Sequence, residues 1–230
     1  MYGLGTTLIL PSSFFAFSAE ISEFLVAKAG ESIARGKTPQ SARRLRAAVE
    51  LDPDVEVGPS KYLVAESFFE DKRWPEAIRF YNAALSEYPD TTSAEMGYFN
   101  LASCYAAVGD SASAIEVLEK QLARFPRGVV ASEAEWHLMN LLYDQARSEF
   151  QRGDYDAAVR LASKVIGRTV NSVVLQKARF LNGESYERKG EYAAAYEQYQ
   201  AIIREDPGAS GRLVERARAK IKAIEDAGLR

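Results

Sequence analysis

The feature that most constrains this chain is a short phrase that recurs four times along it. Each copy holds an alanine followed directly by a larger residue, and these alanines are Ala77, Ala114, Ala158 and Ala195. The intervals between them are 37, 44 and 37 residues. A fixed period of about 20–50 residues indicates a repeat architecture, in which similar units stack and share a continuous core. The chain is therefore expected to fold as a stack of units and not as one globule.

Other residue types recur in register when each of these alanines is numbered as position 20 of its unit. Position 8 is small, which lets two helices approach closely. Position 11 is large except at Glu149, and position 32 is a helix-ending proline except at Val170. In chain order, position 8 holds Ala65, Ala102, Ala146 and Gly183, position 11 holds Phe68, Tyr105, Glu149 and Tyr186, and position 32 holds Pro89, Pro126, Val170 and Pro207.

Each unit is expected to contain two short helices joined by a turn. Apolar residues recur at spacings of three and four in both halves of a unit, which is typical of amphipathic helices. A glycine followed by an acidic residue separates the halves at Gly109, Gly153 and Gly190, and glycine permits the backbone to reverse there. One helix pair cannot bury both of its faces, so neighbouring pairs are expected to stack.

This residue set resembles the tetratricopeptide repeat, a helix–turn–helix unit of about 34 residues. The resemblance covers residues 20–208, or about five repeats, because an earlier and weaker unit places Ala29 at position 8 and Ser41 at position 20. It implies an all-α fold, a right-handed superhelical solenoid of antiparallel helix pairs.

The C-terminal segment, residues 209–230, is expected to form a capping helix. Its apolar residues Leu213, Ala217, Ile221 and Ile224 lie at helical spacing with charged residues between them. Repeat arrays need such a helix to cover the open end of the last unit. The alternative is a helix that binds a membrane surface or a partner.

One helix is expected to be longer than its neighbours. The stretch between Pro126 and the next unit has seven more residues than the stretch after Pro89, which predicts a single helix over residues 131–151. Trp136 and His137 lie on the added turns. These turns either act as a protruding spacer or form a contact ridge.

The N-terminal segment, residues 1–19, has no charged residue and is apolar from Leu8 to Phe17. This apolar run is too short for a membrane span of about 20 residues, but it has the length of a signal-peptide core. The alternative is a segment that folds onto the first helices. The unit endings at Tyr88-Pro89 and Phe125-Pro126 are also similar to those of bacterial cell-envelope tetratricopeptide proteins, namely outer-membrane assembly lipoproteins and Tol-Pal coordinators. The periplasm or cell envelope is therefore favoured over the cytoplasm.

The family resemblance implies a binding groove lined by the first helix of every unit, with contacts at positions 2, 5, 9, 12 and 13. Position 5 is aromatic in four successive units, and these rings would form a ladder along the inner surface. Replacing one of them with alanine is expected to weaken partner binding by about 1–3 kcal/mol without unfolding the array. The alternative is that they belong to the core. The predicted binding residues are Tyr62, Glu66, Phe69, Met96, Phe99, Asn100, Asn140, Tyr143, Arg147, Lys177, Phe180 and Glu184.

The sequence argues against catalysis and against several partner classes. Cys104 and His137 are the only residues of their kinds, and no glycine-rich phosphate loop or metal-ligand spacing is present. The net charge of −3 gives no basic footprint for nucleic acid. We expect no enzyme activity, cofactor, metal or small-molecule substrate, and a protein or peptide as the partner.

Two further expectations concern the type of partner. Chaperone-binding members of the family hold a terminal carboxylate with lysine, arginine and asparagine residues, and here only Asn100 matches, whereas Tyr62 and Glu66 do not. A chaperone tail is therefore not the expected ligand. The leading interpretation is an interaction scaffold, and the alternative is a structural protein that forms homo-oligomers through its terminal segments.

Overall fold

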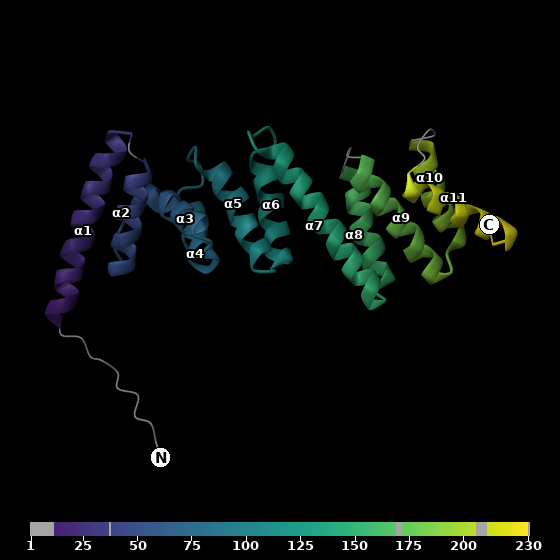
Figure 1. Cartoon of the computed structure of the whole chain (residues 1–230), viewed down its shortest axis with the longest axis horizontal. Coiled ribbons are helices and arrows are strands. Elements are labelled where there is room, and N and C mark those ends of the chain that lie inside the picture. Colours follow the sequence, from purple (N-terminus) through teal and green to yellow (C-terminus); the bar gives the residue numbers. More distant parts are fainter. Residues whose placement is uncertain (1–11, 37, 169–171, 206–210, 230) are drawn as a thin grey trace, which may run out of the picture. The chain divides into compact units, whose positions relative to one another are not determined.

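The computed structural model describes residues 12–36, 38–168, 172–205 and 211–229. Within these ranges every regular element is a helix, which confirms the predicted all-α class (Figure 1). The elements are α1 (Ser12–Ala34), α2 (Thr38–Leu51), the 3-10 helix η1 (Gly58–Ser60), α3 (Lys61–Glu70), α4 (Trp74–Glu87), α5 (Ala94–Ala107), α6 (Ser111–Arg124), α7 (Ala131–Arg152), α8 (Tyr155–Arg168), α9 (Ser172–Lys189), α10 (Tyr192–Glu205) and α11 (Arg212–Asp226).

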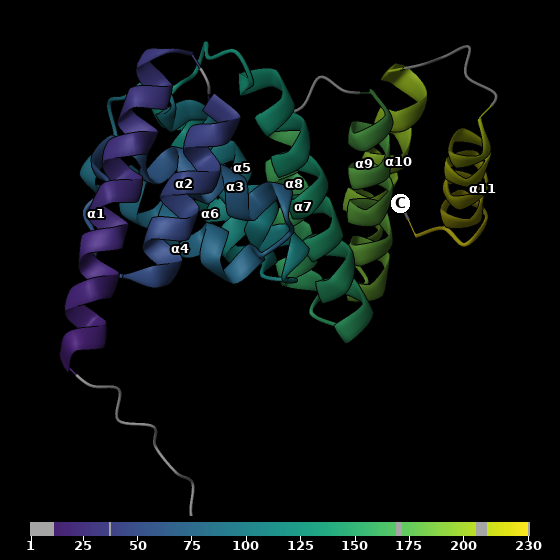
Figure 2. The same cartoon turned by 60° about the vertical axis from the view of Figure 1, so that its left-hand side comes forward.

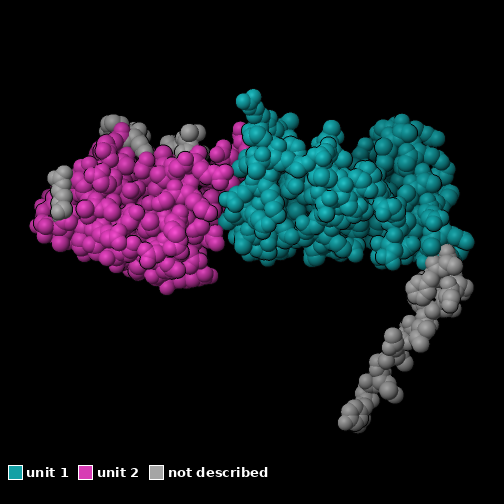
Figure 3. Space-filling view, turned by 180° about the vertical axis from the view of Figure 1, so that it is seen from behind, with its two compact units in different colours: residues 1–130 teal, residues 131–230 magenta. Residues whose placement is uncertain are grey.

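The helices belong to two compact units, residues 1–130 and 131–230 (Figure 3). Unit 1 holds α1 to α6, and unit 2 holds α7 to α11. Inside each unit, successive helices pack in pairs, for example α7 with α8 and α9 with α10 (Figure 2). The array expected over residues 20–208 is thus divided after Val130.

Parts of the predicted pattern lie outside the described residues. They include the apolar run at Leu8, Val170 and the terminal Pro207. The predicted N-terminal segment, residues 1–19, overlaps α1, because this helix begins at Ser12. Among the described residues, no helix combines the length and the apolar character that crossing a membrane requires.

The small residues at position 8 face the core, as predicted. Ala65, Ala102 and Ala146 are at most 3 % exposed, and Gly183 is buried as well. A Cβ atom on Gly183 would lie 2.5 Å from the ring of Tyr199. Such close approach between helices leaves no space for a side chain at this position, which explains the residue type.

The first predicted repeat, whose match to the pattern is the weakest, follows the same plan with one substitution. Ala29 and Ser41 are both fully buried, and the Ser41 hydroxyl donates a hydrogen bond of 3.2 Å to the Ala29 carbonyl oxygen. A buried hydroxyl costs free energy unless it is hydrogen-bonded. Serine can therefore replace the usual alanine at position 20 because its hydroxyl has a partner on the facing helix.

The turns between helices confirm the role predicted for glycine. Gly109, Gly153 and Gly190 have φ angles of 83°, 87° and 79°, which lie in the left-handed region. The acidic residue after the turn then caps the next helix in two cases. Asp110 accepts a hydrogen bond of 3.0 Å from the Ser113 amide, and Asp154 accepts one of 2.9 Å from the Ala157 amide.

The turn between α3 and α4 lacks this glycine. Lys72 occupies it with a φ angle of 59°, and it is the only described non-glycine residue with a positive φ. Replacing Lys72 with glycine is expected to raise the free energy of unfolding by up to about 1 kcal/mol, because the left-handed conformation costs a lysine about 1–2 kcal/mol and glycine loses more chain entropy on folding. Urea denaturation measures this change. In contrast, Lys164→Gly inside α8 should lower the free energy of unfolding by about 1 kcal/mol. A loss of stability at both positions would show that the left-handed conformation of Lys72 does not cost free energy.

The extended helix is present at the predicted place. Helix α7 has 22 residues, whereas its neighbours α6 and α8 have 14 each. Trp136 on the added turns is 49 % exposed, and its ring meets the imidazole of His137 edge-on at 4.9 Å. The spacer and the contact ridge both stay predictions for these turns.

The C-terminal helix covers the end of the last repeat, as predicted. Val214, Ala217 and Ile224 of α11 are buried in one cluster with residues of α9 and α10, and Leu213 and Ile221 pack against this cluster. Arrays of repeats require a terminal element with one polar face. The remaining residues of α11 are mostly charged and exposed, which fits this role.

Cys104 is a core residue. Its side chain is fully buried in α5, and burial raises the pKa of the thiol to about 12. A thiol reacts through its thiolate, so Cys104 is not placed to act as a nucleophile.

Candidate functional site

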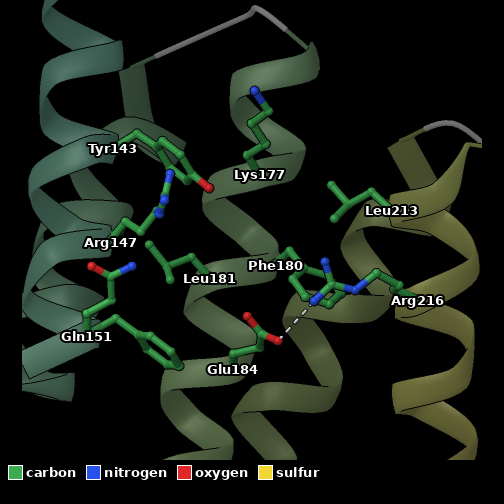
Figure 4. Close-up of a pocket in the computed structure, with 10 residues that line it drawn as sticks. Tyr143, Arg147, Gln151, Lys177, Phe180, Leu181, Glu184, Leu213 and Arg216 are labelled. Carbon is green, nitrogen blue, oxygen red and sulfur yellow. Dashed lines mark hydrogen bonds and ion pairs between the residues drawn. The ribbon is translucent and has the colours of Figure 1, made fainter. Parts of the chain in front are cut away.

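Unit 2 contains a cavity of about 400 Å³ that is built by three helices. Helix α7 supplies one wall, α9 the floor and a second wall, and α11 the third wall (Figure 4). The cavity combines aromatic, aliphatic and charged side chains. The lining residues are Tyr143, Arg147, Phe150, Gln151, Lys177, Phe180, Leu181, Glu184, Leu213 and Arg216.

The floor of this unit 2 cavity is rigidly supported. Phe180 and Leu181 are only 4 % and 5 % exposed, and the Phe180 ring packs on the ring of Tyr199 with centroids 5.4 Å apart. The guanidinium of Arg216 lies over the Phe180 ring, 4.3 Å from its centroid. Aromatic groups fixed in this way offer contact area without a large entropy cost on binding.

The walls carry four charged groups, of which two form a pair. A nitrogen of Arg216 lies 3.2 Å from a carboxylate oxygen of Glu184, as the dashed line in Figure 4 shows. Arg147 and Lys177 are exposed, and neither forms an ion pair with any residue in the described ranges. Burial raises the pKa of Tyr143, which therefore stays neutral at physiological pH.

Unit 1 contains a smaller cavity of about 260 Å³ at its own inner helices. The Tyr62 hydroxyl donates a hydrogen bond of 2.9 Å to the Tyr88 carbonyl oxygen, and the Asn100 amide donates one of 3.0 Å to the Tyr81 hydroxyl. Burial raises the pKa of Glu66, and the nearby Glu70 raises it further. The lining residues are Tyr62, Leu63, Glu66, Tyr81, Thr92, Ser93, Met96, Gly97 and Asn100.

A third cavity of about 530 Å³ lies between α2 and α3, where no binding residue except Glu66 was predicted. Some of its basic and acidic side chains form ion pairs with one another or with nearby residues. Arg46 forms ion pairs with Glu50 and Asp71 and lies over the Phe68 ring. These interactions join neighbouring helix pairs and have a structural role.

The predicted binding residues fall into three groups. The unit 2 cavity brings together five of them, and the smaller unit 1 cavity brings together four. The other three are Phe69, which packs edge-on against Trp74 at 5.6 Å, half-buried Phe99, and Asn140, whose amide donates to the Trp136 carbonyl oxygen; they line none of these cavities. The five in unit 2 are Tyr143, Arg147, Lys177, Phe180 and Glu184, and the four in unit 1 are Tyr62, Glu66, Met96 and Asn100.

The ladder of aromatic rings along the inner surface stays a prediction, but the alternative that these rings belong to the core applies to two of them. Tyr62 and Phe180 are 6 % and 4 % exposed, so they are core residues that also form cavity floors, whereas Phe99 and Tyr143 are half-buried. Alanine at Tyr62 or Phe180 is therefore expected to reduce the stability of the fold as well as any binding.

Five lining residues of the unit 2 cavity were not predicted: Phe150, Gln151, Leu181, Leu213 and Arg216. The first three lie on the same two helices as predicted residues, and helical spacing could have found them. Leu213 and Arg216 lie on α11, which is outside the repeat register, so no repeat position indicates that they face the groove.

The described residues include no group of histidine, cysteine, aspartate and glutamate side chains that could hold a metal ion. The cavity in unit 2 also lacks a nucleophile beside a base. Its chemistry is that of contact, stacking and charge, which suits the binding of a partner.

Comparison with known proteins supports this architecture. A tetratricopeptide repeat model matches residues 29–91 and 143–210, and a second one matches residues 98–124. A solved tetratricopeptide repeat protein from Bacteroides fragilis shares 11 % sequence identity and has a TM-score of 0.59, with 88 % of this chain and 98 % of that chain covered. At this identity the likeness shows the fold alone.

Among curated proteins, Hsp70-Hsp90 organizing protein 2 of Arabidopsis thaliana is 26 % identical over 134 residues. These residues are 54 % of this chain, but they span only 23 % of the relative. These comparisons show the repeat family, and they do not show the cell-envelope type that the unit endings suggested. Because the repeat models together cover more than half of the sequence, the chain belongs to the tetratricopeptide repeat family.

Proposed function

We propose that this protein is an interaction scaffold that binds a peptide segment of a partner protein in the unit 2 cavity. Tetratricopeptide repeat proteins generally mediate protein–protein interactions. The observation that carries the proposal for this chain is that five groove residues predicted from the repeat register line one cavity with a buried aromatic floor. A buried aromatic floor under a polar rim is typical of interface hot spots.

A chaperone tail is not the ligand that we propose, although the Arabidopsis relative is named for organizing Hsp70 and Hsp90. The positions compared with the chaperone-binding pattern, Tyr62, Glu66 and Asn100, line the cavity in unit 1. Glu66 is the only charged lining residue of that cavity, and its carboxylate would repel a terminal carboxylate there. Asn100, the one residue that matches the chaperone-binding pattern, already donates a hydrogen bond to Tyr81.

Tyr143 is the residue whose removal tests the proposal with the least damage to the fold, because it is half-buried at the cavity wall. Replacing Tyr143 with alanine is expected to weaken the binding of peptides selected from a random library by about 1–2 kcal/mol, since an aromatic contact surface is lost. Fluorescence anisotropy with labelled peptides measures this loss, and circular dichroism checks that the helix content is unchanged.

The matched control is Tyr192→Ala. Tyr192 is also half-buried in unit 2, but it does not line the cavity. Its replacement should leave peptide affinity within about twofold, a change below 0.5 kcal/mol. Equal losses of affinity in both variants, or no loss in Tyr143→Ala, would show that the cavity is not the binding site.

The biological setting is a separate part of the proposal. The unit endings at Tyr88-Pro89 and Phe125-Pro126 support a role in bacterial envelope assembly, which fractionation of the native source and N-terminal sequencing test. Self-association through the terminal segments stays a prediction, and light scattering of the intact chain and of a chain without residues 209–230 tests it.

A further inference from the structure

The charges at the unit 2 cavity are unbalanced. Three cationic side chains line it, from Arg147, Lys177 and Arg216, against the single carboxylate of Glu184. Glu184 is engaged by Arg216 at 3.2 Å, which leaves Arg147 and Lys177 without an opposite charge in the described ranges. Asp144 follows Tyr143 on α7 and is exposed, but it does not line the cavity.

This excess of positive charge is local and not a property of the whole chain. The chain as a whole carries a net charge of −3. The smaller cavity in unit 1 has the opposite sign, since Glu66 is its only charged lining residue. Glu66 and Arg147 occupy the same position 9 of their repeats and differ in sign, whereas Glu184, at position 9 of the next repeat in unit 2, has the same sign as Glu66.

Helix α11 contributes to the cavity as well as covering the core. Its buried face, with Val214 and Ala217, packs on α9 and α10, and this fixes the flank that carries Leu213 and Arg216. Arg216 is held both by Glu184 and by the face of the Phe180 ring. The capping helix therefore supplies an apolar and a cationic group at fixed places in the cavity wall.

We propose that the unit 2 cavity selects a partner segment in which an acidic side chain stands next to an apolar or aromatic one. This inference rests on the proposed function. The apolar side chain packs between Tyr143, Phe180 and Leu213. The carboxylate faces the unpaired cations of Arg147 and Lys177, where charge-assisted hydrogen bonds are stronger than neutral ones. The occupant is an internal acidic segment of a protein: Arg147 and Lys177 lie on two different helices, α7 and α9, so they can face acidic side chains along an extended segment.

The test uses the full-length chain and a random peptide library displayed with blocked C-termini. The wild-type protein should enrich peptides with aspartate or glutamate beside a large apolar residue. The variant Arg147→Glu/Lys177→Glu should bind those peptides at least about tenfold more weakly and should enrich lysine or arginine instead. The affinity of the wild-type protein for an enriched peptide should also fall as salt is raised.

The matched control is Lys164→Glu/Lys222→Glu, which makes the same charge change at exposed sites of α8 and α11 outside the cavity. It should retain the acidic preference and the affinity within about twofold. An equal loss of affinity in both double variants would overturn the proposal, because it would show a nonspecific charge effect.

The remaining outcomes separate this inference from the proposed function. Enriched peptides that bind at the cavity without an acidic preference would overturn the inference and leave the function intact. Enrichment that appears only when the same library is displayed with free C-termini would overturn the internal acidic segment and leave the function intact. Failure of the wild-type protein to enrich any peptide from the blocked or the free library would overturn both.

Discussion

Replacing Tyr199 with alanine is expected to lower the free energy of unfolding of unit 2 by about 3–5 kcal/mol. Tyr199 is fully buried in α10, where its ring contacts Phe180 at 5.4 Å between centroids and fills the space left by Gly183. Removing a large buried aromatic side chain loses its transfer free energy and leaves a cavity that helices cannot fully close. The loss should also displace Phe180, the floor of the unit 2 cavity.

The two tryptophans allow this change to be measured in one unit at a time. Trp74 lies in α4 of unit 1 and Trp136 in α7 of unit 2. In a Trp74→Phe background, the fluorescence of Trp136 during urea denaturation reports on unit 2. The control Tyr192→Ala, at a half-buried site of the same helix, should cost less than half as much. A cost for Tyr199→Ala of less than about 1 kcal/mol would contradict the packing described here.

Replacing Gly183 with leucine is expected to destabilise unit 2 by about 3 kcal/mol, the upper end of the usual cost of overpacking. A Cβ atom at this position would lie 2.5, 2.7 and 3.0 Å from three atoms of the Tyr199 ring. Because that ring is fully buried, it has no free space into which it can move. The same denaturation experiment measures the cost.

The control for this prediction is expected to change the stability in the opposite direction. Gly167 also lies in a helix, α8, but it is exposed and a Cβ atom there would meet nothing within 4 Å. Gly167→Leu should therefore stabilise the unit by up to about 1 kcal/mol through helix propensity. The cost of Gly183→Leu should shrink when Tyr199 is replaced by leucine, since the two sites are in contact. Additive effects would show that Gly183 does not face Tyr199.

The repeat register could be predicted because it depends on residues that pack against their own neighbours. Alanine at position 8 and glycine at the turn each satisfy a local steric demand, and the structure buries Ala65 and places Gly109 at a φ angle of 83° accordingly. The length of α7 followed from counting the residues between Pro126 and the start of the next repeat. None of these inferences needed knowledge of distant contacts.

The burial of individual groove residues could not be predicted in the same way. Tyr62 and Tyr143 share position 5, yet Tyr62 is buried and Tyr143 is half-buried. Tyr62 packs inward over Gly97, where a Cβ atom would lie 2.6 Å from its ring. In the repeat that follows the one with Tyr143, the residue equivalent to Gly97 is Ala178, which carries the methyl group that Gly97 lacks. Whether a position-5 ring is floor or wall thus depends on a neighbour about 35 residues away, which a repeat pattern does not specify.

The contribution of α11 was missed for a related reason. Its apolar stripe showed that the helix caps the array, but a stripe does not tell which flank borders a cavity. Arg216 was recognised only as a charged residue between apolar ones. Its place follows from the way in which Ala217 and Val214 dock on α9 and α10, and this docking is a tertiary feature.

Methyl NMR of the full-length chain during titration with a library-selected acidic peptide tests the central claim most directly. Leu181 and Leu213 line the unit 2 cavity, whereas Leu138 of α7 and Leu118 of unit 1 are buried away from it. The account predicts that the methyl signals of Leu181 and Leu213 shift in proportion to bound peptide while those of Leu118 and Leu138 hardly change. Shifts confined to methyl groups of unit 1, or to the outer helix α8 through Leu161, would contradict it.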